Sequence, residues 1–281
     1  MISRRCLFWL FLALTPFVLV ACSSTSSTLG QIHEGRILSL TVLEMDRFEE
    51  LRYSTPYSLD PSDATHQWRI QPSKSGLELL LVRMRVGNHI AVNAVFVADQ
   101  RAAILRDFFE NDYFPLSVGN TVYLDRRGRS EASVTMEGGQ CTDHARLVVN
   151  AGTNVEWTNS GDTASAIQFG PGELPALGND PVQIAPGGSV SHLFDQPGTF
   201  DYLCAGGEDS GGEEAPQEAQ ILVENADSVR SGRDDNILFL ENTFELSRGE
   251  EVDGWMVFEV PVDTQIRDLR WRAGDSITIR F

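Results

Sequence analysis

The chain of 281 residues is long enough to form two medium-sized domains, each with its own hydrophobic core. Its 40 Asp and Glu residues outnumber its 22 Lys and Arg residues, so its formal net charge at pH 7 is −18. An acidic surface of this kind repels nucleic acid and anionic lipid headgroups, which excludes nucleic acid as an expected partner.

Residues 1–21 have the features of a targeting segment. Arg4 and Arg5 precede an apolar stretch, residues 6–20, that is too short for an ordinary membrane-spanning helix. Residues 19–22 (LVAC) then resemble the lipobox of bacterial lipoproteins. The resemblance implies that Cys22 is lipidated, that residues 22–34 form a flexible tether, and that the protein is anchored on the extracytoplasmic side of a membrane. An ordinary cleaved signal peptide and an uncleaved anchor are the alternatives.

Residues 35–129 are predicted to be rich in β-strands. Residues 37–43, 67–70 and 77–86 have the apolar or alternating pattern of strands, and residues 90–97 are expected to pair with 77–86 across a turn at 87–88. Residues 99–111 are predicted to be helical, because Ala102, Leu105 and Phe109 recur at helical spacing. Residues 113–124 are expected to be extended.

Residues 130–225 are predicted to form an antiparallel β-sandwich. Short apolar or alternating segments between 132 and 224 are separated by turns rich in Gly, Pro, Asn and Asp. Several landmarks follow one another in this region: AG at 151–152, NVEWTN at 154–159, PG at 186–187 and FDQPGTFDYLC at 194–204.

These landmarks resemble those of the cupredoxins, the family of plastocyanin and amicyanin. The resemblance implies a Greek-key sandwich, with Cys204 at the position of the copper-binding thiolate. A blue-copper site also needs two imidazoles and usually a weak axial thioether. Ser165 and Gly207 stand where the resemblance places the two His ligands, and residues 205–219 contain neither Met nor His. We therefore expect no cofactor, with copper binding as the alternative.

Cys141 and Cys204 are the cysteines that remain beyond Cys22, and two cysteines in an oxidising compartment suggest a disulfide. The cupredoxin resemblance places Cys141 beneath the metal loop, where it could reach Cys204. Two alternatives stay open at this stage. The cysteines could be unpaired and buried, or Cys141, His144 and Cys204 could form an improvised site for Cu(I) or Zn.

Residues 236–281 follow a polar linker, residues 226–235, and are too short to build a core alone yet too apolar to be disordered. Ile277, Ile279 and Phe281 alternate with polar residues and should face inward. The tail is therefore expected to pack on residues 35–129, which makes the first domain discontinuous and the cupredoxin-like unit an insertion. Parts of 115–128 and 241–261 resemble immunoglobulin-like domains of bacterial surface lipoproteins. The predicted fold class is thus all-β, with two β-sandwiches.

No sequence motif for catalysis is present: we find no Ser-His-Asp signature and no phosphate-binding Gly loop. The leading hypothesis is a non-catalytic, membrane-anchored binding or envelope-structural module that is not an enzyme. The rival hypotheses are a membrane-tethered copper protein for electron transfer or copper delivery, and a thiol-dependent redox enzyme that uses Cys204. The acidic stretch after Cys204 disfavours the redox enzyme, because negative charge raises the pKa of a thiol.

Overall fold

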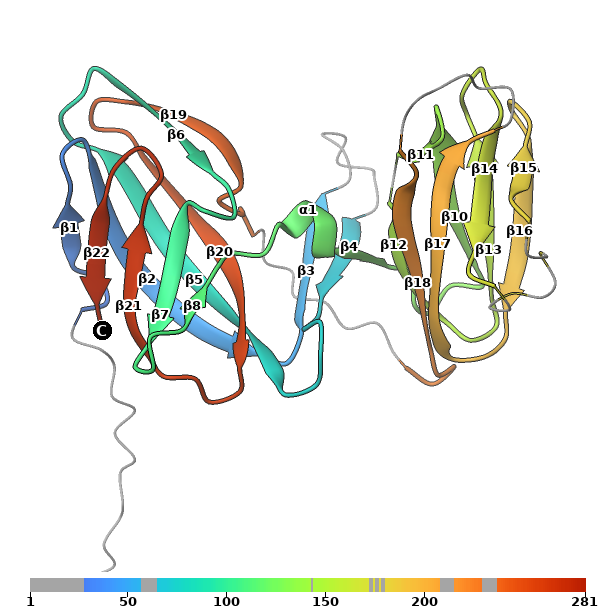
Figure 1. The fold of residues 1–281 in the computed structure, drawn as a ribbon, viewed down its shortest axis with the longest axis horizontal. Helices are drawn as coiled ribbons and strands as arrows, with labels where there is room; N and C mark the ends of the chain where they lie inside the picture. Colours follow the sequence, from blue (N-terminus) through green and yellow to red (C-terminus); the bar gives the residue numbers. More distant parts are fainter. Residues whose placement is uncertain are drawn as a thin grey trace, which may run out of the picture.

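The computed structural model describes residues 28–56, 65–142, 144–171, 174, 177, 180–207, 215–228 and 237–281. These residues form strands joined by turns, with one four-residue helix, α1 (Val118–Thr121), and the all-β prediction is confirmed. The strands gather into two sandwiches joined by a narrow middle part (Figure 1). We call them the first sandwich, which contains both the earliest and the last strands, and the second sandwich.

The first sandwich has a four-stranded sheet on one side and a second four-stranded sheet with a two-stranded sheet on the other. The first of these has the order β1-β2-β5-β20, and the sheets opposite it have the orders β22-β21-β7-β8 and β19-β6. The strands are β1 (Ile32–Glu34), β2 (Leu38–Phe48), β5 (Leu77–Asn88), β6 (Asn93–Ala98), β7 (Ala103–Asp107), β8 (Asp112–Tyr113), β19 (Asn242–Ser247), β20 (Glu251–Pro261), β21 (Ile266–Trp271) and β22 (Ile277–Arg280).

The tail strands lie at the centre of the first sandwich. β20 pairs antiparallel with β5 over the whole of its length, and β21 lies between β7 and β22. Trp271 and Phe258 are completely buried in the same cluster as Leu40 of β2 and Val82 of β5. Strands more than 160 residues apart in the sequence therefore share one core.

The alternation at the end of the chain places side chains as expected. Ile277 and Ile279 are buried in the core of the first sandwich, and Phe281 packs against that core while remaining half-buried.

The helix expected at residues 99–111 is wrong, because this segment contains β7 instead. Residues 102–105 are buried one after another, whereas Phe109, which helical spacing had placed on the same face, is among the most exposed apolar residues. Pairing of β7 with β21 and β8 satisfies the backbone of this segment and overrides its local helical pattern. Residues 113–124, expected to be extended throughout, contain α1.

The predicted pairing of residues 90–97 with 77–86 is also wrong. β5 is flanked by β2 and β20, and β6 pairs with β19. The buried Asn88 explains the difference: its amide nitrogen donates to the carbonyls of Ala91 and Leu246, both at 2.9 Å, and its oxygen accepts from the Ala91 N–H. This side chain turns the backbone away from β5 and fixes it beside the end of β19.

The second sandwich packs a four-stranded sheet, of order β11-β10-β13-β16, against the larger part of an eight-stranded sheet. The eight-stranded sheet has the order β15-β14-β17-β18-β12-β9-β4-β3. The strands are β3 (Leu51–Pro56), β4 (Thr65–Ile70), β9 (Tyr123–Asp125), β10 (Glu131–Glu137), β11 (Gln140–Cys141), β12 (Arg146–Asn150), β13 (Thr153–Asn159), β14 (Ser165–Phe169), β15 (Val182–Ile184), β16 (Ser189–Phe194), β17 (Gly198–Gly206) and β18 (Gln217–Glu224).

Three strands within residues 35–129, the range predicted to belong to the first sandwich, instead extend the sheet of the second. β9 pairs in parallel with β12, β4 pairs with β9, and β3 pairs with β4. The β3–β4 hairpin lies between the sandwiches (Figure 1). Its buried Leu51, Tyr53 and Ile70 pack against Leu79 and Leu81 of β5, which form a separate small core.

Both faces of β5 are therefore used. Leu80, Val82, Met84 and Val86 point into the core of the first sandwich, while the alternate residues at its start cover the hairpin. The hairpin thus connects the two sandwiches through hydrogen bonds on one side and apolar packing on the other.

Candidate functional site

The core of the second sandwich is organised around Trp157 of β13, which is completely buried. Its ring contacts those of Phe169 and Tyr202, each with centroids 5.7 Å apart and nearly perpendicular planes. Burial raises the pKa of Tyr202 to about 12, because a phenolate in this interior would lose its hydration. The landmark strands at 154–159 and 194–204 thus hold the interior of the sandwich.

Cys204 is joined to Cys141 by a disulfide, and this prediction is confirmed. Cys204 lies on β17 opposite Ile167, and Cys141 lies on the short strand β11 opposite Met136. Both cysteines are buried, and their Cα atoms are 5.9 Å apart, within the usual range for a disulfide. A bond of this kind, closing a long loop, typically stabilises a domain by about 2–4 kcal/mol.

Ser165 is fully buried on β14, opposite Gly206, and in the described structure its hydroxyl has no hydrogen-bond partner. Its short side chain points into a packed interior, so it offers copper only a weak hydroxyl ligand.

Gly207 has no room for a side chain. Its N–H donates to the carbonyl of Ala164 at 2.8 Å, and a Cβ added to it would lie 2.6 Å from the Cβ of Ala164 and 2.7 Å from Oε1 of Gln183. An imidazole at this position would require its neighbours to move.

The turn between β10 and β11 closes the same end of the sandwich. At Gly139, whose φ of 83° favours glycine, an added Cβ would lie 2.3 Å from the backbone nitrogen of Gly206. The backbone of this turn therefore packs directly against the end of β17, two residues after Cys204.

His144 lies at the junction of the two sandwiches, where its ring contacts aromatic rings of the β3–β4 hairpin. Its ring packs on Trp68 of β4 at a centroid distance of 4.6 Å and approaches His66 at 5.5 Å. Because both cysteine sulfurs are bonded to each other, neither can act as the thiolate of the improvised Cys141, His144 and Cys204 site. In the part of the chain that the structure describes, no three His, Cys, Asp or Glu residues are grouped to hold a metal ion.

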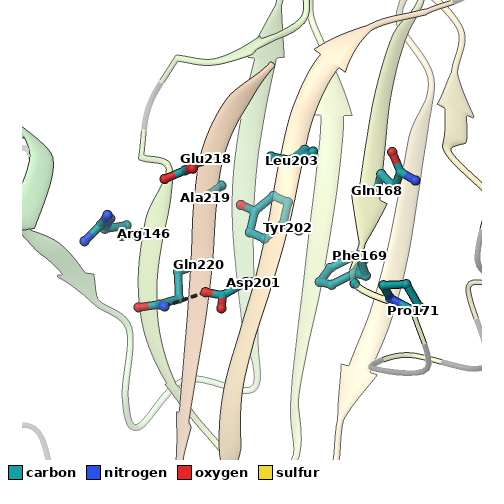
Figure 2. A pocket seen from close by; sticks show the side chains of 11 residues that line it. Arg146, Gln168, Phe169, Pro171, Asp201, Tyr202, Leu203, Glu218, Ala219 and Gln220 are labelled. Carbon is teal, nitrogen blue, oxygen red and sulfur yellow. Dashed lines mark hydrogen bonds between the residues drawn. The ribbon is translucent and has the colours of Figure 1, made fainter. Parts of the chain in front are cut away.

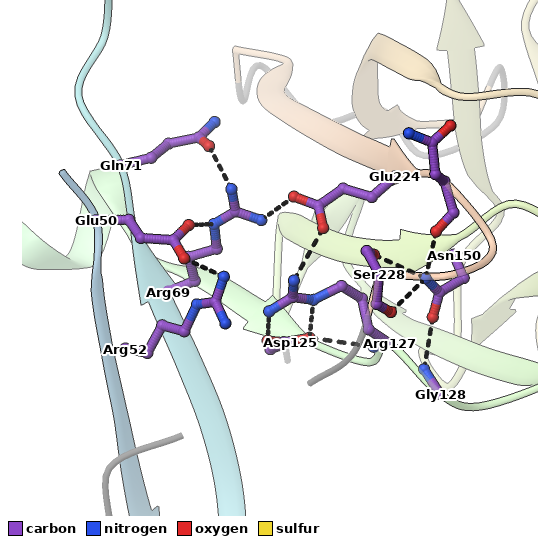
Figure 3. A network of polar contacts seen from close by, with 11 residues as sticks. Glu50, Arg52, Arg69, Gln71, Asp125, Arg127, Gly128, Asn150, Glu224 and Ser228 are labelled. Carbon is purple, nitrogen blue, oxygen red and sulfur yellow. Dashed lines mark hydrogen bonds and ion pairs between the residues drawn. The ribbon is translucent and has the colours of Figure 1, made fainter. Parts of the chain in front are cut away.

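A network of charged side chains, which the sequence did not reveal, joins the hairpin to the second sandwich (Figure 3). Arg127 is almost completely buried and donates to both carboxylate oxygens of Asp125, at 2.6 and 3.0 Å. It also donates to Glu224 at 2.8 Å, and the other oxygen of Glu224 accepts from Arg69 of β4. Arg69 continues the chain to Glu50 at 2.7 Å.

Burial by itself would raise the pKa of Glu224. Hydrogen bonds from Arg69 and Ser228 and the positive charge of Arg127 outweigh that effect and hold the pKa below its usual value. Arg127 lies immediately before the turn into the second sandwich and Glu224 ends its last strand, so the network closes the place where the chain enters and leaves this unit.

A shallow cavity of about 480 Å³ lies on the outer face of the eight-stranded sheet (Figure 2). Asp201 and Gln220 face it and bond to each other at 2.5 Å, and Gln220 also accepts from the hydroxyl of Tyr123. Arg146 borders the cavity with its guanidinium 5.7 Å from the ring of Tyr123. Asp201 and Gln220 are thus occupied by each other and by Tyr123.

Cys22 lies outside the residues that the structure describes, as does the signal segment before it. Among the residues that are described, no helix is both long and apolar enough to cross a membrane.

Comparisons with known proteins give similarity of structure alone. No family model and no curated protein sequence matches the chain. Solved structures similar to part of it include oxidised amicyanin with a proline-to-alanine substitution, at 22% identity over 34% of this chain and 83% of that one, with a TM-score of 0.25. A purple cupredoxin from Nitrosopumilus maritimus is similar at 20% identity over 33% of this chain and 99% of that one, with a TM-score of 0.25.

Proposed function

We propose that this protein is a lipid-anchored extracytoplasmic module that binds a partner or supports the cell envelope without catalysing a reaction. In this proposal the first sandwich is immunoglobulin-like, and the second is a cupredoxin-like scaffold without type 1 copper. The observation that carries the proposal is the disulfide between Cys141 and Cys204.

The disulfide supports the proposal because it consumes the ligand on which a blue-copper centre depends. Such a centre needs a thiolate held in a plane with two imidazoles. Here the sulfur of Cys204 is bonded to another sulfur, Ser165 offers only a hydroxyl, and Gly207 is packed against Ala164 and Gln183. In this proposal the disulfide links the two sheets at this end of the sandwich, where a bound copper ion would otherwise link them.

We expect that Cu(II) added to the purified full chain will not produce the intense visible absorption of a blue-copper centre. The measurement is an absorption titration, combined with metal analysis after dialysis and peptide mapping without reductant. The mapping should recover Cys141 and Cys204 in one disulfide-linked pair.

Two variants give this titration its controls. A stoichiometric blue species that is lost in Cys204→Ser and kept in His144→Ala would contradict the proposal and show that Cys204 binds copper with ligands at positions other than 165 and 207. Loss of the colour in both variants would support the rival site built from Cys204 and His144. Either result would revive the copper-protein hypothesis.

We expect Cys22→Ala to abolish lipid attachment and to leave the chain either uncleaved or released from the membrane. The reason is that the Cys thiol is the group acylated in the lipobox resemblance, and stable anchoring needs more than one acyl chain. Metabolic labelling with a fatty acid, followed by fractionation, measures both effects, and Cys6→Ala in the apolar stretch is the matched control. Unchanged labelling of Cys22→Ala would contradict the anchoring proposal.

A further inference from the structure

The strand β6 has only one hydrogen-bonded neighbour among the described strands. It pairs with β19 and forms no ladder on its other side. The N–H of Arg248 donates to the carbonyl of Val92, so these two residues form a hydrogen-bonded pair. In an antiparallel ladder every second residue of β6 then bonds to β19, and the residues between them do not. Ala94, Phe96 and Ala98 therefore bond to β19, and the N–H and C=O groups of Asn93, Val95 and Val97 point to the free edge.

The free edge lacks the features that usually protect such strands. β6 (NAVFVA) contains no charged residue and no proline, and its register with β19 runs without a bulge. Apart from Asn93, its outward side chains are apolar: Val95 and Val97 are both more than half exposed, as are Ile90 and Val92 just before the strand. Ala94, Phe96 and Ala98 anchor the opposite face in the core, so the edge is held rigidly in place.

A groove of about 660 Å³ runs beside this edge. Val95 and Val97 line one side of it, and Ile104 of β7 and the half-exposed Phe114 contribute apolar surface. Gly274 borders the groove close to the carbonyl of Val95 and adds no side chain that would cover it. The groove therefore combines a row of unpaired backbone groups with an apolar lining.

The charge at the groove is opposite to that of the whole molecule. Arg101 and Arg272 line it and both are exposed. Among the ion pairs of the described residues neither takes part, and the charge of Arg272 acts only at longer range, where it helps to lower the pKa of Asp112. Asp99 is the carboxylate in the lining, and it accepts a bond from the backbone N–H of Arg101 at 2.7 Å. In a chain with a net charge of −18, two unpaired arginines beside one apolar edge favour an acidic ligand.

We propose that the free edge of β6 binds an extended peptide segment of another protein, which adds to the β19-β6 sheet as a third strand. The segment carries apolar side chains on one face and a carboxylate that reaches Arg101 and Arg272. Main-chain hydrogen bonds supply the affinity, and the apolar lining and the two arginines supply the specificity. A strand as long as β6 requires about six residues in extended form.

This inference deepens the binding role proposed above and identifies a surface for it on the first sandwich. It does not depend on the disulfide, on copper or on the lipid. A failed lipid-labelling experiment or a blue copper complex would therefore leave it standing, and its own failure would leave the proposal for the second sandwich intact.

Synthetic peptides test the proposal on the full chain purified in mild detergent. The probes are three fluorescent peptides in which Val and Thr alternate around a central residue, which is Glu, Lys or Pro. We expect the Glu peptide to bind and to slow amide hydrogen exchange at residues 93–97. The Lys peptide should bind about tenfold more weakly or worse, which corresponds to about 1.4 kcal/mol, and the Pro peptide should not bind because it cannot continue the ladder.

Matched variants distinguish binding at the β6 edge from nonspecific binding to exposed apolar side chains. Val97→Lys should abolish binding of the Glu peptide, whereas Leu193→Lys, at an equally exposed apolar position on the edge strand β16, should not. The double variant Arg101→Glu, Arg272→Glu should reverse the preference towards the Lys peptide.

Several results would overturn the proposal. They are equal binding of the three peptides, no binding of any of them, protection outside residues 93–97, or indifference to Val97→Lys. Concentration-dependent dimerisation that protects residues 93–97 without peptide would replace the proposed partner with a second copy of this chain.

Discussion

Deletion of residues 236–281 is expected to unfold the first sandwich. The deletion removes β20, which pairs with β5 along its full length, and β21, which lies between β7 and β22. It also removes Phe258 and Trp271 from the core. Loss of one large buried aromatic side chain costs about 3–5 kcal/mol, and a domain has only about 5–15 kcal/mol of stability in total.

Hydrogen exchange and circular dichroism measure this outcome. Exchange in β2 and β5 should become as fast as in an unfolded chain, while the fragment of residues 129–225, which keeps β10 to β18, should retain a cooperative unfolding transition. A fragment of residues 35–129 that unfolds cooperatively, with protected amides in β2 and β5, would contradict this account.

Replacing Arg127 with Ala is expected to lower the free energy of unfolding by about 3–5 kcal/mol. The substitution leaves the buried carboxylate of Asp125 without its charged partner, with only the backbone N–H of residue 127 still bonded to it, and takes one of two guanidinium groups from Glu224. An uncompensated charge in a buried position is costly because it has lost its hydration. Urea denaturation followed by Trp fluorescence measures the change.

Arg85→Ala is the matched control for this variant. Arg85 is ion-paired with Asp253 at 3.2 Å, but its side chain is 44% exposed. An exposed pair of this kind contributes less than about 1 kcal/mol. A loss in Arg127→Ala no larger than that in Arg85→Ala would show that the junction network does not stabilise the fold.

The same network predicts how stability depends on pH. The pKa of Glu224 is lower in the folded chain than in the unfolded chain, so unfolding takes up a proton in acid. The stabilisation from Glu224 is therefore complete above the unfolded pKa of this carboxyl and is lost as the pH falls through its folded pKa. This acid-induced loss should shrink in Arg127→Ala, in which part of the cause of the lowered pKa is gone.

The two wrong predictions for the first sandwich concern segments whose strand partners lie far away in the sequence. Ala102, Leu105 and Phe109 do recur at helical spacing, but β21 occupies one edge of this segment and forces it to be extended. The pairing of β6 was missed for a related reason: the turn around Asn88 depends on a bond to Leu246, which lies on a strand of the tail. Local pattern cannot anticipate a partner more than 150 residues away.

The sequence did, in contrast, indicate much of the strand pattern, and it favoured a disulfide between Cys141 and Cys204 over the two alternatives. Alternation and turn residues act locally, so they indicated the all-β class, the landmark strands around Trp157 and the inward-facing residues at the end of the chain. The types of residue at 165 and 207 already argued against a set of copper ligands, because neither Ser nor Gly supplies the imidazole that a blue-copper site needs.

The sequence by itself thus indicated the all-β class and many of the strands, and it placed Ser and Gly where the resemblance calls for imidazoles. Tertiary structure alone decided that β9, β4 and β3 extend the second sandwich, that Arg127 is buried between Asp125 and Glu224, and that β6 keeps one edge free. Strand order, burial of charge and exposure of an edge all depend on which distant segments meet. They follow from the packing of the whole chain and produce no local sequence pattern from which they could be predicted.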